Sequence, residues 1–401
     1  MPERSVVLYI NEVSWVGGAE GAMLDLVTNL DRERFLPAAV CPSDGEFPRM
    51  LRERGVPTHI VPFYGLRARN PFRYLETIGR LCTLVRRYRA RLIHVNQQYF
   101  AGYGVAAARL CRVPAVVHLR GVESDECLAE LAPWILRASR IICVSKAVKA
   151  RLLDFAARRL APGRAAQLEQ RALVVYDGLR LVARVLDKKE ARNRLGIASD
   201  GQVVGIVGQV VPEKGLREFV DAAAILLRKK SNLHFVVIGA DTRPDRDFPA
   251  ELAGYARQLG VCESFTFTGF REDAAEVLPA LDVSVLASWL DAFPRVVLES
   301  LAAGVPTIAT RVGGVPEIIE DGVSGLLVEP RSAESLAEGI LRVLEMAPTE
   351  YARMADSART RAARFSISGH LERIVSIYDE LLATKTNAGT SRPTSHHTDP
   401  E

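Results

Sequence analysis

Short, continuously apolar runs alternate along this chain with longer segments of helical periodicity, and this alternation limits the fold more than any other feature. In the first half the runs lie at 6–10, 35–41, 58–63, 91–96, 115–119, 140–145 and 173–177. In the second half they lie at 203–209, 234–239, 265–269, 283–287, 305–310 and 325–328. Because the runs are continuously apolar, they predict strands buried on both faces, as in parallel sheets covered by helices.

The repetition of this plan over 401 residues predicts an α/β protein with two Rossmann-like, doubly wound domains. We expect an N-terminal domain at 1–180 and a C-terminal domain at 181–369, joined within 178–200. Ligands of such sheets bind outside the carboxyl ends of the strands, so two facing domains predict a ligand in a central cleft. An apolar stripe at helical spacing predicts a final helix at 370–383, and the polar segment 384–401 predicts a disordered tail.

The charge is uneven, because residues 1–180 carry 27 Lys and Arg against 17 Asp and Glu while the remainder is net acidic. This balance favours an anionic partner such as a membrane surface, or else a solvated arginine-rich face. Near the end of the predicted helix 72–89, several arginines accompany apolar residues, which predicts an amphipathic surface helix. The residues concerned are Arg80, Arg86, Arg87, Arg89 and Arg91, with Leu81, Leu84 and Val85.

Other features narrow the location and the class of partner. The six cysteines show neither C-x-x-C nor ligand spacing, which is typical of thiols in a reducing cytosol. The apolar runs are too short for a signal segment or a membrane span. We therefore expect a cytoplasmic protein that attaches at most peripherally to the inner face of a membrane. Aromatic and basic residues do not interleave, which argues against a nucleic-acid partner.

The densest motif surrounds a predicted helix start at Pro294, a residue type that suits the first position of a helix. The backbone amides of Arg295, Val296 and Val297 would then face outward at the positive end of the helix dipole. Such an arrangement can hold a phosphate group.

Two carboxylates flank this helix start, Asp291 before it and Glu299 within it. One can accept hydrogen bonds from sugar hydroxyls and the other from ribose hydroxyls. The alternative is structural, since Glu299 can pair with Arg295 four residues earlier and Asp291 can cap the helix.

Three further candidate sites lie at or just after the ends of predicted strands. Lys214 lies on a loop that opens a helix, where its ammonium group can bind a diphosphate. Gly17 and Gly18 follow the first strand and permit close approach of the backbone, or form a plain turn. His118 stands near the end of the run 115–119, where a histidine is either structural or close to the ligand.

In this order, and over about residues 6–380, these motifs resemble those of the retaining GT-B glycosyltransferases of family four. The stretch from Asp291 to Glu299 is similar to the family's E-x-x-x-x-x-x-x-E, with Asp in place of the first Glu. The resemblance implies that Asp291 contacts the donor sugar and that Glu299 contacts the nucleotide ribose. It further implies that the backbone around Phe293 and Arg295 meets the phosphates and the sugar.

The lysine loop resembles the family's G-R-x-x-x-x-K-G, with Lys214 in the phosphate-binding place and Gln209 in the place of the arginine. The resemblance implies catalytic roles for His118, Asp291 and Lys214. It also implies donor contacts from Gly17, Gly18, Gln209, Lys214, Phe270, Asp291, Phe293, Pro294, Arg295, Val296 and Glu299. No metal or other cofactor is expected, because Lys214 and helix amides would neutralise the departing diphosphate.

The function implied is that of a retaining, metal-independent hexosyltransferase. Its donor would be a nucleotide-sugar, a UDP-sugar in the first place and GDP-mannose in the second, and its acceptor a cell-envelope glycan or lipid-linked acceptor. Two alternatives stay open: a sugar-nucleotide 2-epimerase on the same fold, and a non-catalytic sugar-nucleotide-binding protein. Asp291 and Gln209, which depart from the family pattern, favour the second alternative.

Overall fold

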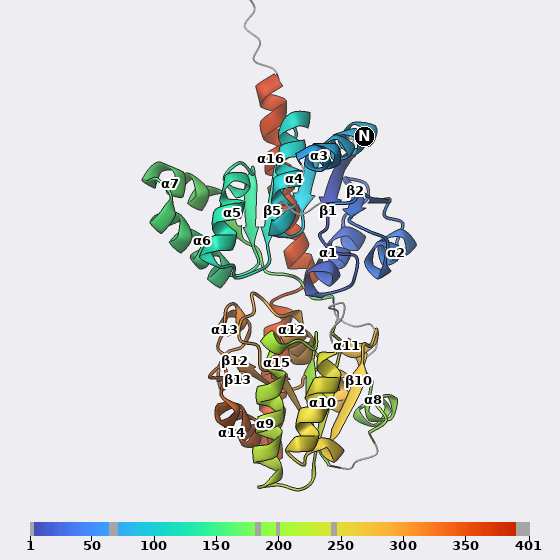
Figure 1. Ribbon diagram of the computed structural model, residues 1–401, viewed down its shortest axis with the longest axis vertical. Helices are drawn as coiled ribbons and strands as arrows, with labels where there is room; N and C mark the ends of the chain where they lie inside the picture. The colour runs from blue at the N-terminus through green and yellow to red at the C-terminus, as the bar shows by residue number, and fades with distance from the viewer. Residues whose placement is uncertain (1–3, 64–70, 181–185, 198–200, 242–246, 390–401) are drawn as a thin grey trace, which may run out of the picture.

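The computed structural model describes residues 4–63, 71–180, 186–197, 201–241 and 247–389. Figure 1 shows two α/β domains placed one above the other, with the N-terminal half of the chain in the upper domain. Parts of the predicted linker and the predicted tail from residue 390 onward lie outside the described residues.

The N-terminal domain holds a seven-stranded parallel sheet with the order β3-β2-β1-β4-β5-β6-β7. Each strand lies within or next to one of the predicted runs. The strands are β1 Ser5–Ile10, β2 Phe35–Cys41, β3 Thr58–Ile60, β4 Leu92–Val95, β5 Ala115–Leu119, β6 Arg140–Cys143 and β7 Ala172–Val174. The helices are α1 Gly18–Asn29, α2 Glu46–Glu53, α3 Pro71–Arg87, α4 Ala101–Cys111, α5 Asp125–Ile135, α6 Lys146–Arg159 and α7 Pro162–Arg171.

The C-terminal domain repeats the plan with a six-stranded sheet of order β10-β9-β8-β11-β12-β13. Its strands are β8 Gln202–Val207, β9 Leu233–Ile238, β10 Phe265–Gly269, β11 Val283–Leu286, β12 Thr307–Thr310 and β13 Gly325–Val328. Its helices are α8 Lys188–Arg194, α9 Leu216–Leu227, α10 Phe248–Gln258, α11 Ala274–Val277, α12 Arg295–Ala302, α13 Val315–Ile318, α14 Ala333–Leu344 and α15 Pro348–Ala363. The prediction of two doubly wound domains is confirmed.

Burial on both faces explains the continuous apolar runs. In β1, Leu8 and Ile10 belong to the core on one face of the sheet, and Val7 and Tyr9 belong to the core on the other. All four side chains are fully buried. Successive side chains of a strand point to opposite faces, so both parities must be apolar when helices cover both faces.

The chain returns to the N-terminal domain through α16, Ile367–Gly389, which extends past the predicted helix end at 383. Ile374 and Tyr378 are fully buried, in the same core as Val7 and Tyr9 of β1. Where the chain crosses back, the amide of Leu179 donates a 2.7 Å hydrogen bond to the carbonyl of Phe365. The two crossings between the domains are therefore paired with each other.

The prediction of a membrane-facing amphipathic helix at 72–89 needs correction. Leu81, Leu84 and Val85 are buried in the core of the N-terminal domain, against the sheet and α4, whereas Arg86 and Arg87 are exposed. The apolar side of the second half of α3 is thus covered by its own domain, whereas Phe72 and Leu75, near the start of the helix, are 80% and 61% exposed. None of the described helices is both long enough and apolar enough to cross a lipid bilayer.

Candidate functional site

A cavity of about 490 Å³ lies between the two domains, and both of them line it. Every predicted site residue lines this cavity except His118 and Phe270. From the N-terminal domain the lining includes Trp15, Val16, Gly17, Gly18, Ala19, Glu20, Gly21, Gln97, Arg120 and Asp177. From the C-terminal domain it includes Gly208, Gln209, Lys214, Asp291, Phe293, Pro294, Arg295, Val296 and Glu299.

Helix α12 begins at this cavity. Pro294 is its N-cap residue, so the helix starts one residue later than predicted, at Arg295. The amide of Val297 donates a 3.2 Å hydrogen bond to the Pro294 carbonyl, and its predicted role toward phosphate is therefore not seen. The amides of Arg295 and Val296 stand in the first turn, where the helix dipole favours an anion.

Lys214 and Asp291 meet directly in the cleft. Lys214 Nζ donates a 2.6 Å hydrogen bond to Asp291 Oδ2, and the Asp291 side chain is 13% exposed. Ser288 Oγ lies 3.4 Å from the same oxygen. Pro294 is the N-cap of α12, so Asp291 does not cap this helix. The alternative interpretation of Asp291 as a helix cap is therefore wrong.

Two glycines hold the loops that carry this pair. Gly215 has a φ of +68°, and a Cβ there would lie 2.0 Å from the Ala287 carbonyl oxygen. Gly313 has a φ of +46°, and a Cβ there would lie 1.8 Å from the Asp291 carbonyl oxygen. Both positions combine left-handed backbone with a contact that leaves no room for a side chain. These glycines therefore fix the backbone on either side of the Lys214–Asp291 pair.

The Glu299 side chain is partly buried, with 24% of it exposed; burial raises the pKa of its carboxyl group, while Arg295 acts in the opposite direction. Arg295 Nε lies 3.8 Å from Glu299 Oε1, which is an ion pair at the edge of its range. The guanidinium instead donates hydrogen bonds to Asp25 Oδ2, at 2.7 Å, and to the Gly178 carbonyl, at 3.2 Å. The ion pair with Arg295 therefore leaves the Glu299 carboxylate able to accept further hydrogen bonds in the cavity.

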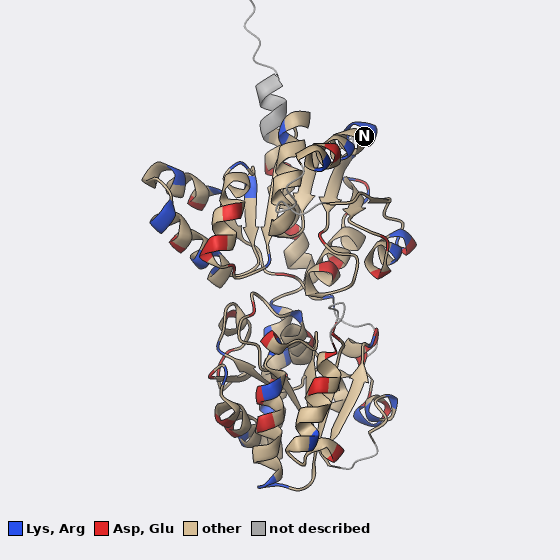
Figure 2. Cartoon of the chain, in the orientation of Figure 1, with Lys and Arg blue, Asp and Glu red and all other residues tan. Residues whose placement is uncertain are grey.

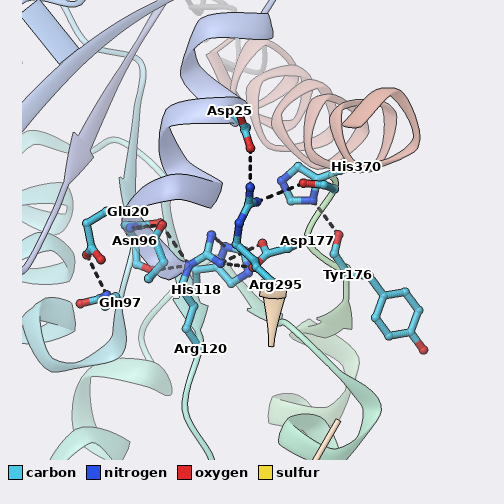
Figure 3. A network of polar contacts seen from close by, with 12 residues as sticks. Glu20, Asp25, Asn96, Gln97, His118, Arg120, Tyr176, Asp177, Arg295 and His370 are labelled. Atoms are coloured by element: carbon cyan, nitrogen blue, oxygen red, sulfur yellow. Dashed lines mark hydrogen bonds and ion pairs between the residues drawn. The ribbon is translucent and has the colours of Figure 1, made fainter. Parts of the chain in front are cut away.

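A buried ion pair, which sequence reasoning missed, forms part of the N-terminal wall of the cleft (Figure 3). Arg120 Nη1 lies 2.8 and 2.6 Å from the two carboxylate oxygens of Asp177, and the side chains are 6% and 4% exposed. Burial acts to raise the pKa of Asp177, but Arg120 and His370 hold it below its usual range. One hint is visible in the sequence, since Arg120 directly follows the run that contains His118.

His118 lies beneath the cleft rather than in it. Its side chain is fully buried, and its Nδ1 accepts a 3.3 Å hydrogen bond from Arg120 Nη2. Burial, aided by Arg120, lowers the pKa of His118 well below its usual value, so the imidazole is neutral. His118 therefore does not line the cavity, whereas Arg120, to which it is hydrogen-bonded, does. Phe270 is 54% exposed on the loop after β10, outside the cavity.

A second contact joins the domains at α6. The Glu317 carboxylate accepts 2.8 Å hydrogen bonds from the amides of Lys146 and Ala147, in the first turn of α6. Tyr176 donates its hydroxyl to the same carboxylate at 2.9 Å, and its ring stacks on Phe293 with 5.2 Å between centroids. A residue of the C-terminal domain thus satisfies the N-terminus of a helix in the other domain.

The comparisons with known families divide the chain as the fold does. The family described as "Glycosyltransferase Family 4" matches residues 16–161, and the one described as "Glycosyl transferases group 1" matches residues 187–361. The D-inositol 3-phosphate glycosyltransferase of Acidothermus cellulolyticus is 34% identical over 212 residues, which are 51% of this chain and 47% of that protein. The chain spans about half the length of the curated relatives it matches.

Solved structures with the same fold cover nearly the whole chain. Anabaena HepE, in complex with UDP-glucose, superposes with a TM-score of 0.81 over 94% of this chain and 99% of HepE, at 24% identity. The lipopolysaccharide outer core galactosyltransferase WaaB, in its apo form, superposes with a TM-score of 0.69 over 95% of this chain and 99% of WaaB, at 17% identity. At these identities the likeness concerns the fold. With both domains matched by the two family descriptions, the chain belongs to the family 4 glycosyltransferases and has the GT-B fold.

Proposed function

We propose that this protein is a retaining, metal-independent hexosyltransferase that takes its sugar from a nucleotide-sugar bound in the cleft. The observation that carries the proposal is the convergence of Lys214, Asp291, Glu299 and the first turn of α12 on one cavity. A cation and helix amides beside two carboxylates offer partners for a diphosphate, a sugar and a ribose.

In the proposed reaction, the diphosphate leaves with its negative charge while the bond to the anomeric carbon breaks. Lys214 and the amides of Arg295 and Val296 would stabilise that charge, which is largest in the transition state. Lys214 is 31% exposed and already points into the cavity, where Asp291 holds it. Asp291 would then bind sugar hydroxyls, and Glu299 the ribose.

For the donor, we propose a UDP-sugar first and GDP-mannose second. Support comes from Anabaena HepE, which has the same fold and is described in complexes with UDP and with UDP-glucose. For the acceptor, we propose a cell-envelope glycan or a lipid-linked acceptor. Support for this class comes from WaaB, which has the same fold and is described as a lipopolysaccharide outer core galactosyltransferase.

A peripheral membrane contact remains part of the proposal, and the argument for it is one of charge. Arg86, Arg87 and Arg89 are exposed at the end of α3, while the apolar residues next to them in this helix are buried. In the view of Figure 2, Lys and Arg are spread over the outer helices of both domains and intermix with Asp and Glu. Attachment by such a surface would be weak and would disappear in salt.

The experiment that tests the proposed function is a product assay with UDP-glucose, other UDP-sugars and GDP-mannose. A transferase releases free UDP or GDP, slowly to water and faster with an acceptor. A 2-epimerase would instead invert the sugar at carbon 2 and yield the epimeric sugar, either still on the nucleotide or free. A binding protein would leave the donor intact. Asp291 and Gln209, which depart from the family pattern and both line the cavity, are the residues that favour the binding-protein alternative.

A further inference from the structure

One guanidinium group joins three separate parts of the chain. Arg295 Nη2 donates to Asp25 Oδ2 of α1 at 2.7 Å, and Nη1 donates to the Gly178 carbonyl in the crossing between the domains at 3.2 Å. Its Nε lies 3.8 Å from Glu299 Oε1 on the same helix. Figure 3 shows the Arg295 side chain reaching toward Asp25 on the first helix of the N-terminal domain.

One face of α1 contacts the Arg295 side chain. Gly18, Gly21 and Asp25 lie three and four residues apart, so they share one face of the helix. A Cβ at Gly21 would lie 3.6 Å from Arg295 Nε, and a Cβ at Gly18 would lie 3.9 Å from Arg295 Cδ. Gly18 and Gly21 of α1 therefore lie against the Arg295 side chain, and Asp25 stands one turn further along the same face.

The pair is largely removed from water. The Arg295 side chain is 13% exposed and that of Asp25 is 17% exposed. A guanidinium that loses its partner in such a place turns to the nearest remaining carboxylate. Here that carboxylate is Glu299, whose oxygens would then be occupied by Arg295 and withdrawn from a ligand.

We propose that Asp25 is a positioning residue for the donor site: acting through Arg295, it holds the two domains together over the cleft and keeps the guanidinium off the Glu299 carboxylate. The inference rests on the proposed function in so far as Glu299 binds the ribose. Asp25 does not itself line the cavity, so its replacement removes no direct donor contact.

The test compares the variants Asp25→Asn and Asp25→Glu with the wild-type protein in calorimetric titrations with UDP. We expect Asp25→Asn to weaken UDP binding about 10-fold, and Asp25→Glu, which keeps the carboxylate, to restore it to within about threefold. With a donor that turns over, Asp25→Asn should raise KM more than it lowers kcat. The matched control is Asp379→Asn. It breaks the exposed ion pair that Asp379 of α16 forms with Arg34, and neither residue lines the cavity.

A second measurement requires no ligand. Small-angle scattering of the free protein should give a larger radius of gyration for Asp25→Asn than for wild type or Asp379→Asn, because one of the contacts that join the domains is lost. UDP binding and radius of gyration that are both unchanged in Asp25→Asn would overturn the inference. If the wild-type protein binds neither UDP nor GDP, the proposed function fails, and the scattering result alone decides whether Asp25 holds the domains.

Discussion

Lys214 Nζ lies 2.6 Å from Asp291 Oδ2, so the cation and the carboxylate expected to hold the two ends of a sugar diphosphate are already paired. Asp291 keeps Lys214 pointed into the cavity, since the flexible lysine side chain would otherwise sample many rotamers. A diphosphate that enters must share the ammonium group with Asp291 or replace it.

Replacing Lys214 by Ala should lower donor turnover by about 10²–10³-fold, because the departing diphosphate loses its cation. The fold should persist, since Lys214 is 31% exposed and lies on a short surface loop. Release of UDP from UDP-sugars is the measurement, and the exposed Lys229→Ala of the same domain is the control. Turnover of Lys214→Ala equal to that of the control would remove Lys214 from the reaction.

Replacing Glu299 by Gln should weaken UDP binding by roughly 10–100-fold, because charge-assisted hydrogen bonds to the ribose hydroxyls become neutral ones. Calorimetric titration measures the change, with the exposed Glu338→Gln on α14 as the control. Glu299→Gln should unfold at a temperature close to that of wild type, since burial already opposes the charged form of Glu299. Unchanged UDP affinity would leave Glu299 with its structural contact to Arg295 alone.

Treatment with EDTA should leave the turnover of a nucleotide-sugar unchanged. Lys214 and the first turn of α12 offer the diphosphate a cation and helix amides without a metal ion. The assay is the same release of UDP, run with EDTA and again after Mg²⁺ or Mn²⁺ is restored. Activity that disappears with EDTA and returns with either ion would contradict this account of charge neutralisation.

Glu12, in the loop between β1 and α1, should make stability depend on pH. Burial, together with Glu20 and Glu123, raises the pKa of Glu12 from 4.5 to about 8. The folded state therefore holds this proton more tightly than the unfolded state, and stability falls as the pH rises from about 4.5 to 8. Glu12→Gln should thus gain up to about 5 kcal/mol over wild type at pH 9 and almost nothing near pH 4.

Thermal unfolding of wild type and Glu12→Gln across this pH range measures that difference. The exposed Glu33→Gln should follow the wild-type curve at every pH, since the Glu33 side chain is 73% exposed. A Glu12→Gln difference that does not grow with pH would mean that Glu12 is ionised in the folded protein at neutral pH.

The exposed arginines at the end of α3 should give weak, salt-sensitive binding to anionic vesicles. Each basic residue near such a surface contributes about 1 kcal/mol, and salt screens it over a Debye length. Flotation with vesicles containing phosphatidylserine should lose most of the bound protein when Arg86, Arg87 and Arg89 are all changed to Ser. The control removes the same charge from the C-terminal domain, at Arg228, Lys229 and Arg353. Equal loss in both triple variants, or no binding at low salt, would remove the electrostatic hypothesis.

The strands were predictable from the sequence because burial on both faces leaves a local mark, as Val7, Leu8, Tyr9 and Ile10 of β1 illustrate. The periodicity of α3 was equally visible, but it could not tell whether a membrane or the protein's own core covers the apolar side. That distinction depends on tertiary packing, and Leu81 turns out to face the core.

Those cleft residues that belong to short sequence motifs were predictable for a similar reason. Lys214 stands next to a glycine after a strand, and Glu299 is one of two carboxylates at a fixed spacing, so the sequence itself marks both residues. Asp25 and Arg120 carry no such mark. Each acts through a partner far away in the chain, Arg295 for one and Asp177 for the other. Only the fold brings such partners together, and the same holds for Glu317 at the first turn of α6.

The central claim is that the donor lies between Lys214, the first turn of α12 and Glu299, and a crystal structure with UDP tests it most directly. The account predicts the diphosphate within hydrogen-bonding distance of Lys214 Nζ and of the amides of Arg295 and Val296, with the ribose hydroxyls on Glu299. Arg295 should remain on Asp25 in that complex. UDP bound elsewhere, or in the cleft with its ribose away from Glu299 and its phosphates away from Lys214, would contradict the account.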